Sequence, residues 1–375
     1  MHGFSYGTIT TMQIIQLFTN RIGKVIMDGV SDPRSWGNHR PADHPVNSKI
    51  ADSDAVFRGF ARVCATAGPQ NCSIARVGDN EDTLLARILA GLDQLHQSYD
   101  DTNEVSFVAA TAWIFRYLYH SSSWDKLDRY LARNVPGLGD VGATSTATSS
   151  KFAQLDVETE PLLPPLPPIW NPLEQRQEMS AAWADYRESL SRIAIRCGDA
   201  VSGSPDDKST TDEVFQELIR SAREVSPTFA ASYGYVYYCH TWTTSAAERY
   251  LGPWDAKPKT PVLVVDTELD PTTPFKAAQL VASDKYLGSS ARLIKLWNYG
   301  HTSYSVRSKC FSDIVFKYFN EDVIPEDKLN NEEDVLCSTE TRILGTGGSF
   351  FCLRDGPLSE HNRRSRHTLG PARGD

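Results

Sequence analysis

Residues 3–7 read Gly3-Phe4-Ser5-Tyr6-Gly7, a Gly-x-Ser-x-Gly pattern. This pattern is typical of a sharp turn from a strand into a helix, in which glycine on both sides avoids clashes and the serine hydroxyl projects from the sheet edge. Residues 9–18 are rich in apolar side chains, and residues 24–29 form a short apolar run that ends in turn residues. We predict from these two stretches a buried helix and then a parallel strand covered on both faces. The chain therefore opens as turn, helix and strand.

Strands and helices alternate again in the last third of the chain. Residues 262–266 and 292–296 have strand character, and residues 274–283 and 311–319 have helical character. Strands that alternate with helices form a parallel sheet with right-handed crossovers. The sequence therefore predicts an α/β fold.

The long middle part of the chain has a different pattern. Apolar residues recur at helical spacing between about 50 and 135, and further helical segments occupy roughly 175–235, so we place these helices outside the sheet. Residues near 141–172 are rich in Thr and Ser and then in Pro, which is typical of a disordered linker. We therefore expect four parts: 1–48 and 256–337 for the α/β core, 49–255 for a helical cap, and 338–375 for a disordered tail.

Two residues complete a catalytic pattern with Ser5. A serine nucleophile needs a base that takes its proton and a carboxylate that holds this base in the right tautomer. Asp270 and His301 each follow a predicted strand, and the carboxyl ends of strands are where open α/β sheets place their sites. Taken singly, an aspartate before proline is also a turn former, and a lone histidine is often structural. We predict that Ser5, Asp270 and His301 converge as nucleophile, acid and base, with the backbone amide of Tyr6 as an oxyanion donor.

Composition excludes several classes of function. The 375 residues carry a formal net charge of -9, and Lys and Arg are not gathered into one stripe, so we expect no nucleic-acid partner. No run of about 18 apolar residues occurs, and the first residues lack a basic stretch followed by an apolar one. We therefore expect no membrane span, and no signal peptide in the chain as written.

The seven cysteines indicate disulfides rather than a metal site. None of them forms a C-x-x-C pair, so a structural zinc site is not expected; three disulfides and one spare cysteine fit better, with Cys64 and Cys72 as the closest pair. Asn71-Cys72-Ser73 is also a glycosylation sequon, which favours an oxidising compartment. The alternative is a cytosolic protein with buried free thiols and a chance sequon.

Several motifs together resemble a known family, the tripeptidyl-aminopeptidase-like serine peptidases, which are related to the prolyl aminopeptidases and have an α/β-hydrolase fold. The matching pieces are Ser5-Tyr6-Gly7-Thr8, Asp28-Gly29-Val30, Ala194-Ile195-Arg196-Cys197-Gly198-Asp199, Thr260-Pro261-Val262-Leu263, Leu269-Asp270-Pro271-Thr272-Thr273-Pro274, Gly300-His301, Cys310 and Cys337. The resemblance covers roughly residues 3–337, and residues 256–337 look like the family's C-terminal domain.

The resemblance implies an activity and a disulfide pattern. Members of this family are typically exported and cleave short peptides from substrate N-termini, and some relatives act as esterases. Ser5, Asp270 and His301 would form the triad, beneath a large helical cap. Together with the order of the cysteines, the resemblance implies bridges that join Cys64 to Cys72, Cys197 to Cys239 and Cys310 to Cys337, leaving Cys352 free.

The chain departs from the family at its start. Family members carry a long segment before the serine turn, with further sheet strands and a Gly-rich loop that supplies an oxyanion amide. Losing one such donor costs about 10²- to 10³-fold in rate, so we expect an incomplete sheet and slow catalysis.

Three functions stay open at this point. The first is an exopeptidase that recognises a free amino terminus through an acidic cap residue, which the sequence does not identify. The second is a carboxylesterase or lipase on the same fold, and the third is a catalytically silent fragment that binds a partner. For the two enzymes we expect a peptide or small ester substrate and no cofactor, and the oligomeric state is open.

Overall fold

The structure, a computed structural model, describes residues 1–38, 49–97, 107–139, 190–201, 209–230, 239–244, 246–305, 307–326, 335–337 and 344. The linker predicted near 141–172 and the tail predicted at 338–375 lie outside these residues, apart from Leu344. Leu344 is buried among apolar side chains of the helical region.

The described residues form a five-stranded parallel sheet, which confirms the predicted α/β class. In spatial order, which is also chain order, the strands are β1 (His2–Phe4), β2 (Ile26–Asp28), β3 (Val262–Leu269), β4 (Ala291–Tyr299) and β5 (Val335–Cys337). The sequence did not predict β5. Three residues are too few to show a period, and this strand is defined only by its pairing with β4, where Ile294 lies opposite Val335.

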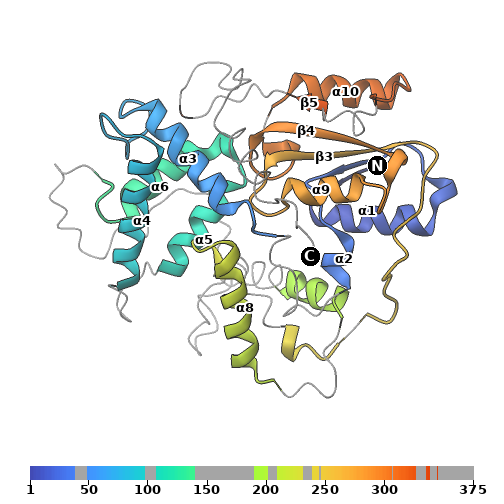
Figure 1. The fold of residues 1–375 in the computed structure, drawn as a ribbon, viewed down its shortest axis with the longest axis horizontal. Helices are drawn as coiled ribbons and strands as arrows, with labels where there is room; N and C mark the ends of the chain where they lie inside the picture. The colour runs from blue at the N-terminus through green and yellow to red at the C-terminus, as the bar shows by residue number, and fades with distance from the viewer. Residues whose placement is uncertain are drawn as a thin grey trace, which may run out of the picture.

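Helices cover both faces of this sheet (Figure 1). Helices α1 (Tyr6–Leu17) and α9 (Phe275–Ala282) share one apolar core with Val262 and Val264 of β3, whereas α10 (Lys309–Asn320) packs on Leu263 and Val265. All four of these strand residues are fully buried. Alternate side chains of β3 therefore point to opposite cores, as expected for a strand covered on both sides.

Helix α1 is less buried than its composition predicts. Met12 and Ile15 are fully buried, but Leu17 is 58% exposed and Phe18, which follows the helix, is 48% exposed. The physical reason is the position of β1 at the outer edge of the sheet. Among the described residues, α1 packs on the sheet through one face only.

The helical region connects β2 to β3. It contains α2 (Pro33–Gly37), α3 (Ser53–Ala67), α4 (Glu81–Gln97), α5 (Phe107–Leu118), α6 (Trp124–Asn134), helical residues 190–199 and α8 (Thr211–Val225). Phe57, Phe60 and Trp124 are fully buried in the core of this region, and Tyr299 at the end of β4 packs against it. The helical region therefore rests on the carboxyl edge of the sheet, where the site is predicted.

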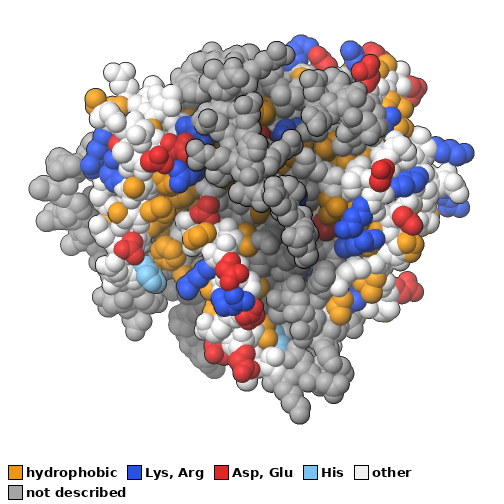
Figure 2. Space-filling model, viewed as in Figure 1, with side chains coloured by type: hydrophobic (Ala, Val, Ile, Leu, Met, Phe, Trp, Pro, Cys, Tyr) orange, Lys and Arg blue, Asp and Glu red, His pale blue; other side chains and the backbone are white. Residues whose placement is uncertain are grey.

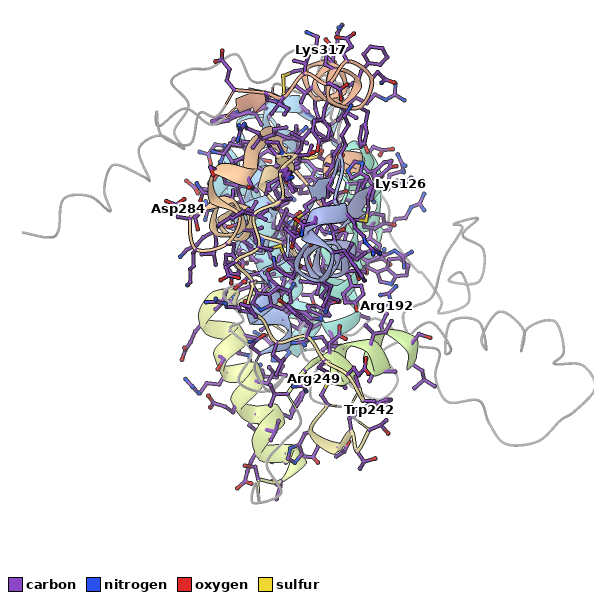
Figure 3. All side chains as sticks on the ribbon, turned by 90° about the vertical axis from the view of Figure 1, so that its right-hand side faces the viewer. Lys126, Arg192, Trp242, Arg249, Asp284 and Lys317 are labelled. Carbon is purple, nitrogen blue, oxygen red and sulfur yellow. A yellow bond between two sulfur atoms is a disulfide. The ribbon has the colours of Figure 1, made fainter. Side chains whose placement is uncertain are left out.

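A side view shows how the two ends of the molecule are arranged (Figure 3). Lys317 on α10 lies at one end, and Trp242 and Arg249 lie at the other. The guanidinium of Arg249 donates a hydrogen bond to the carbonyl oxygen of Ala200, just after helical residues 190–199. This contact joins the segment that precedes β3 to the end of helical residues 190–199.

Three disulfides join Cys64 to Cys72, Cys197 to Cys239 and Cys310 to Cys337, the same pairs that the resemblance implies. Cys352 lies outside the described residues. The last of the three bridges connects α10 to β5 and so fixes the outermost strand to the helix that covers it.

The predicted sequon lies beside the first bridge. Asn71 is exposed and its side-chain amide donates to the carbonyl oxygen of Ala67 at 3.3 Å. Ser73 donates through its hydroxyl to the buried carboxylate of Asp128 at 2.9 Å. The asparagine is therefore accessible, while the serine of the sequon is engaged in the fold.

The surface of the described residues is mixed in charge. Basic and acidic side chains alternate over the face seen in Figure 2, and neither sign dominates it. In the part of the chain that the structure describes, no helix is long and apolar enough to cross a membrane.

Candidate active site

Ser5 occupies the turn between β1 and α1 in a backbone conformation that side-chain-bearing residues seldom adopt. Its φ is 52° and its ψ is -120°. Its amide donates to the carbonyl oxygen of Asp28 at 2.9 Å, and its own carbonyl oxygen accepts from the hydroxyl of Thr8 at 2.6 Å. Such strain persists only where surrounding contacts hold it, and these hydrogen bonds fix the turn from both sides.

The two glycines beside Ser5 differ in what they permit. A Cβ at Gly3 would meet the hydroxyl of Thr11 and the carbonyl oxygen of Gly7, the latter at 2.7 Å, so β1 and α1 approach too closely for any side chain. A Cβ at Gly7 would meet no heavy atom of the described residues within 4 Å. The expectation that both glycines avoid clashes therefore applies to Gly3 and not, within these residues, to Gly7.

Asp270 and His301 are in direct contact. Asp270 follows β3, His301 follows β4, and their Oδ2 and Nδ1 atoms are 2.7 Å apart. The other oxygen, Oδ1, accepts from the amides of Thr272 and Thr273 at 2.8 Å each. Burial alone would raise the pKa of this fully buried carboxyl, but the charge and hydrogen bond of His301 and the two amides hold its pKa below the usual value.

Thr273 is a member of this site that the sequence did not identify. Its hydroxyl donates to Oδ2 of Asp270 at 2.8 Å and lies 3.1 Å from Nδ1 of His301. The available signal was the turn Asp270-Pro271-Thr272-Thr273, because an aspartate often binds backbone amides two and three residues later. The side-chain contact to His301 depends on the neighbouring strand and has no local signal.

Three contacts hold His301 in place. Its amide donates to the carbonyl oxygen of Tyr119 at 2.8 Å, and the two rings are in edge contact with centroids 5.1 Å apart. Gly29 faces the ring so closely that a Cβ there would lie 3.1 Å from its Cε1. Nε2 is buried and has no hydrogen-bond partner among the residues that the structure describes. One nitrogen is therefore fixed by Asp270, and the other remains available.

Ser5 and His301 each contact the chain at residues 28–29. Ser5 bonds the carbonyl oxygen of Asp28, and His301 packs on Gly29. No hydrogen bond joins Ser5 to His301 within the described residues. The structure thus joins the acid to the base, and the convergence of Ser5 with this pair remains a prediction.

Asp28 connects the histidine loop to the first strand. This fully buried carboxylate accepts from the amide and the hydroxyl of Ser303, at 2.8 and 2.5 Å, and its Oδ2 lies 3.0 Å from Nε2 of His2. Because Ser303 lies two residues after His301, Asp28 fixes the position of the loop that carries the base.

Tyr6 offers two hydrogen-bond donors, its backbone amide and its side-chain hydroxyl. As the first residue of α1, it has an amide with no intrahelical acceptor, which is what an oxyanion donor requires. Its hydroxyl donates to Oδ2 of Asp199 at 2.9 Å. Burial and then the charge of Asp199 raise the pKa of Tyr6, so the phenol stays protonated and donates.

Three further ionisable groups interact electrostatically with Asp270. Burial and then the charge of Asp270 raise the pKa of Asp52 to about 7 and hold that of Asp266 well above its ordinary value. Burial and then the charge of Arg196 lower the pKa of Lys49 to about 7. Among Asp52, Asp266 and Asp270, only Asp270 has a pKa that its surroundings lower, so it is the carboxyl that they keep ionised.

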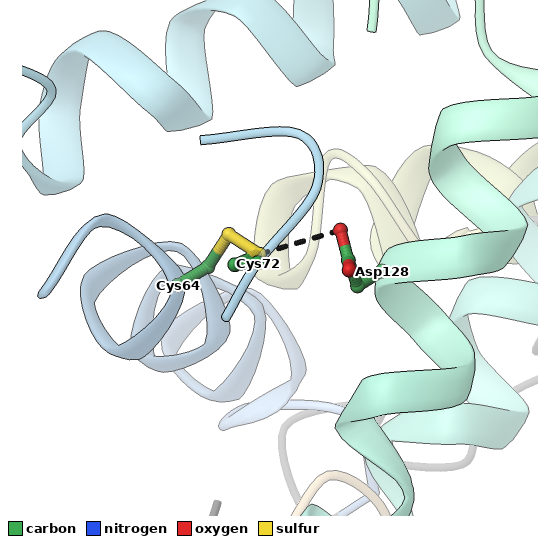
Figure 4. A group of neighbouring side chains, drawn as sticks. All are labelled: Cys64, Cys72 and Asp128. Carbon is green, nitrogen blue, oxygen red and sulfur yellow. Dashed lines mark hydrogen bonds between the residues drawn. A yellow bond between two sulfur atoms is a disulfide. The ribbon is translucent and has the colours of Figure 1, made fainter. Parts of the chain in front are cut away.

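One group of side chains has the composition of a metal site. The sulfurs of Cys64 and Cys72 and a carboxylate oxygen of Asp128 lie within 4.8 Å of one another (Figure 4). The two sulfurs are bonded to each other, so neither is a thiolate, and Asp128 accepts from the amides of Ser73 and Ile74. These atoms are therefore committed to the fold.

Comparison with known proteins identifies one region. Residues 226–333 match the model of an α/β-hydrolase family that is described as TAP-like protein. The matched region contains β3, α9, β4 and α10, and so both Asp270 and His301, but not Ser5. No curated protein matches the chain.

Proposed function

We propose that this chain, which carries a TAP-like α/β-hydrolase domain at residues 226–333, is a serine peptidase that releases short peptides from substrate N-termini. The observation that carries the proposal is the contact between Asp270 and His301, with Nε2 of His301 left without a partner among the described residues. A histidine fixed in this way is the kind of base that a serine nucleophile requires.

The proposed reaction uses one base twice. Nδ1 of His301 donates to Asp270, so Nε2 takes the proton of the Ser5 hydroxyl as its oxygen attacks the scissile carbonyl carbon. The amide of Tyr6 donates to the oxygen that becomes negative. The imidazolium then gives its proton to the leaving amine, and water, activated by the same nitrogen, releases the acyl group from Ser5.

The helical region is proposed to act as a cap over this site. Its contact with His301 through the carbonyl oxygen of Tyr119 places it at the sheet edge where the substrate would enter. The three disulfides support an oxidising, extracellular compartment for the protein.

A fluorophosphonate probe tests the proposal directly, because it labels only an activated serine. We expect labelling at Ser5 and its loss in Ser5→Ala. Asp270→Asn should label roughly 10⁴-fold more slowly, because asparagine would hold His301 in the wrong tautomer. Ser221→Ala, on the remote helix α8, is the matched control and should label normally. Unlabelled wild-type protein, or labelling that survives Ser5→Ala, would contradict the proposal. Rates on a tripeptidyl amide and on a matched ester then distinguish a peptidase from an esterase.

A further inference from the structure

A carboxylate of the helical region lies next to the serine turn. Tyr6 directly follows Ser5, and its hydroxyl donates to Oδ2 of Asp199 at 2.9 Å. The indole N–H of Trp36 donates to the same oxygen at 2.8 Å, and the Tyr6 and Trp36 rings are 5.3 Å apart. Asp199 is therefore held in place by two aromatic side chains.

The charge of this carboxylate is not neutralised by its partners. Tyr6 and Trp36 are uncharged donors, and no ion pair involves Asp199 among the residues that the structure describes. By contrast, the carboxylate of Asp79 is paired at 2.6 Å with Arg87. Asp199 is partly exposed, so a ligand can reach its carboxylate.

Two basic side chains pack on the Trp36 indole that donates to Asp199. Arg196 stacks on Trp36 with its guanidinium carbon 4.4 Å from the ring centroid, and it donates to the Trp36 carbonyl oxygen at 2.8 Å. Nζ of Lys49 lies 4.8 Å from the same centroid. Both basic side chains are buried, at 2% and 8% exposed, and they hold the indole in place.

We infer that Asp199 binds the free α-ammonium group of a peptide substrate, an inference that rests on the proposed peptidase function. An ammonium and a carboxylate form the strong, short type of hydrogen bond. The side chain of Tyr6, the residue after Ser5, reaches Asp199, so one tyrosine side chain separates the backbone beside Ser5 from this carboxylate. Each extended substrate residue covers about 3.3–3.6 Å. The site therefore fits a peptide whose amino terminus lies only a few residues before the scissile bond.

The test measures binding and needs no turnover. In the Ser5→Ala background, calorimetry compares the affinity of a tripeptide amide that has a free amino terminus with that of its N-acetylated counterpart. We expect a clear preference for the free amine. Asp199→Asn should reduce this preference by roughly 10- to 100-fold, the effect of one hydrogen bond between charged groups. Asn keeps an oxygen that accepts from Tyr6 and Trp36, so the fold should survive.

Two controls make the result decisive. Asp212→Asn removes an exposed carboxylate at the start of α8 and should leave the preference unchanged, whereas Asp199→Glu should restore part of it. No preference in the parent protein, or a preference that Asp199→Asn leaves intact, would overturn the inference. Failure of Ser5 labelling would instead overturn the proposed peptidase, and the affinities still decide the role of Asp199.

Discussion

Gly29→Ala should displace His301, the proposed base, without changing any of the three proposed catalytic residues. Gly29 has a φ of +65°, in the left-handed region that costs a residue with a Cβ about 1–2 kcal/mol. The new Cβ would also lie 2.5 Å from Cγ2 of Thr302 and 3.1 Å from Cε1 of His301. Carbon atoms prefer a separation of about 3.5–4.0 Å, so the loop must move by roughly 1 Å. A misplacement of that size can cost about 10²-fold in rate.

Gly68→Ala is the matched control for this experiment. Gly68 has nearly the same φ, +69°, but a Cβ there would meet no heavy atom of the described residues within 4 Å. Its ψ of 177° lies in a region that residues with a Cβ rarely adopt, so Gly68→Ala should show a conformational cost of about 1–3 kcal/mol in the free energy of unfolding without a clash. Both variants should lose stability, but only Gly29→Ala should slow the labelling of Ser5.

The assay is the rate of fluorophosphonate labelling per folded molecule, with thermal unfolding measured on the same samples. Thr302→Ser removes the closest clashing methyl group, so adding it to Gly29→Ala should recover part of the lost rate. Equal labelling rates for Gly29→Ala and Gly68→Ala would refute the reasoning. A double variant no faster than Gly29→Ala would show that Thr302 does not transmit the displacement.

Three further predictions concern the surroundings of the site and the disulfides. Thr273→Val removes one hydroxyl that bonds both Asp270 and His301, and should slow Ser5 labelling while Thr272→Val, which leaves its amide in place, should not; equal rates would contradict this. Asp52 has a pKa near 7 in the fold and an ordinary value of 3.8, so it binds more protons folded than unfolded between these values, and its contribution to stability falls as pH rises from about 4 to 7. Asp52→Asn should therefore melt at a higher temperature than wild type at pH 8 and gain less at pH 5; a gain that does not depend on pH would count against it. Replacing both cysteines of the bridge with sequence separation 42 by alanine should lower the free energy of unfolding by about 4 kcal/mol in denaturant titrations, and no measurable loss would contradict the loop-entropy argument.

The sequence alone determined the local elements of this protein. The glycine before Ser5 predicts a tight turn, the apolar stretch after it predicts a helix, and the alternation of strand and helix predicts a parallel sheet. These features depend on short windows of sequence, because helix and strand periods are repeated within ten to fifteen residues. The same local reasoning places Asp270 and His301 at strand ends, and therefore at one edge of the sheet.

The tertiary structure decided which side chains meet at that edge. Thr273 reaches the imidazole only because β3 and β4 are neighbours, and Tyr119 holds His301 only because the helical region rests on the sheet. Asp199 and Tyr6 are 193 positions apart, and their hydrogen bond has no counterpart in either local sequence. Such contacts are set by the packing of separate elements. The hydrophobic effect that drives this packing is non-directional, so a local apolar pattern does not specify which side chains meet. Only the folded chain therefore shows which carboxylate the tyrosine after Ser5 contacts.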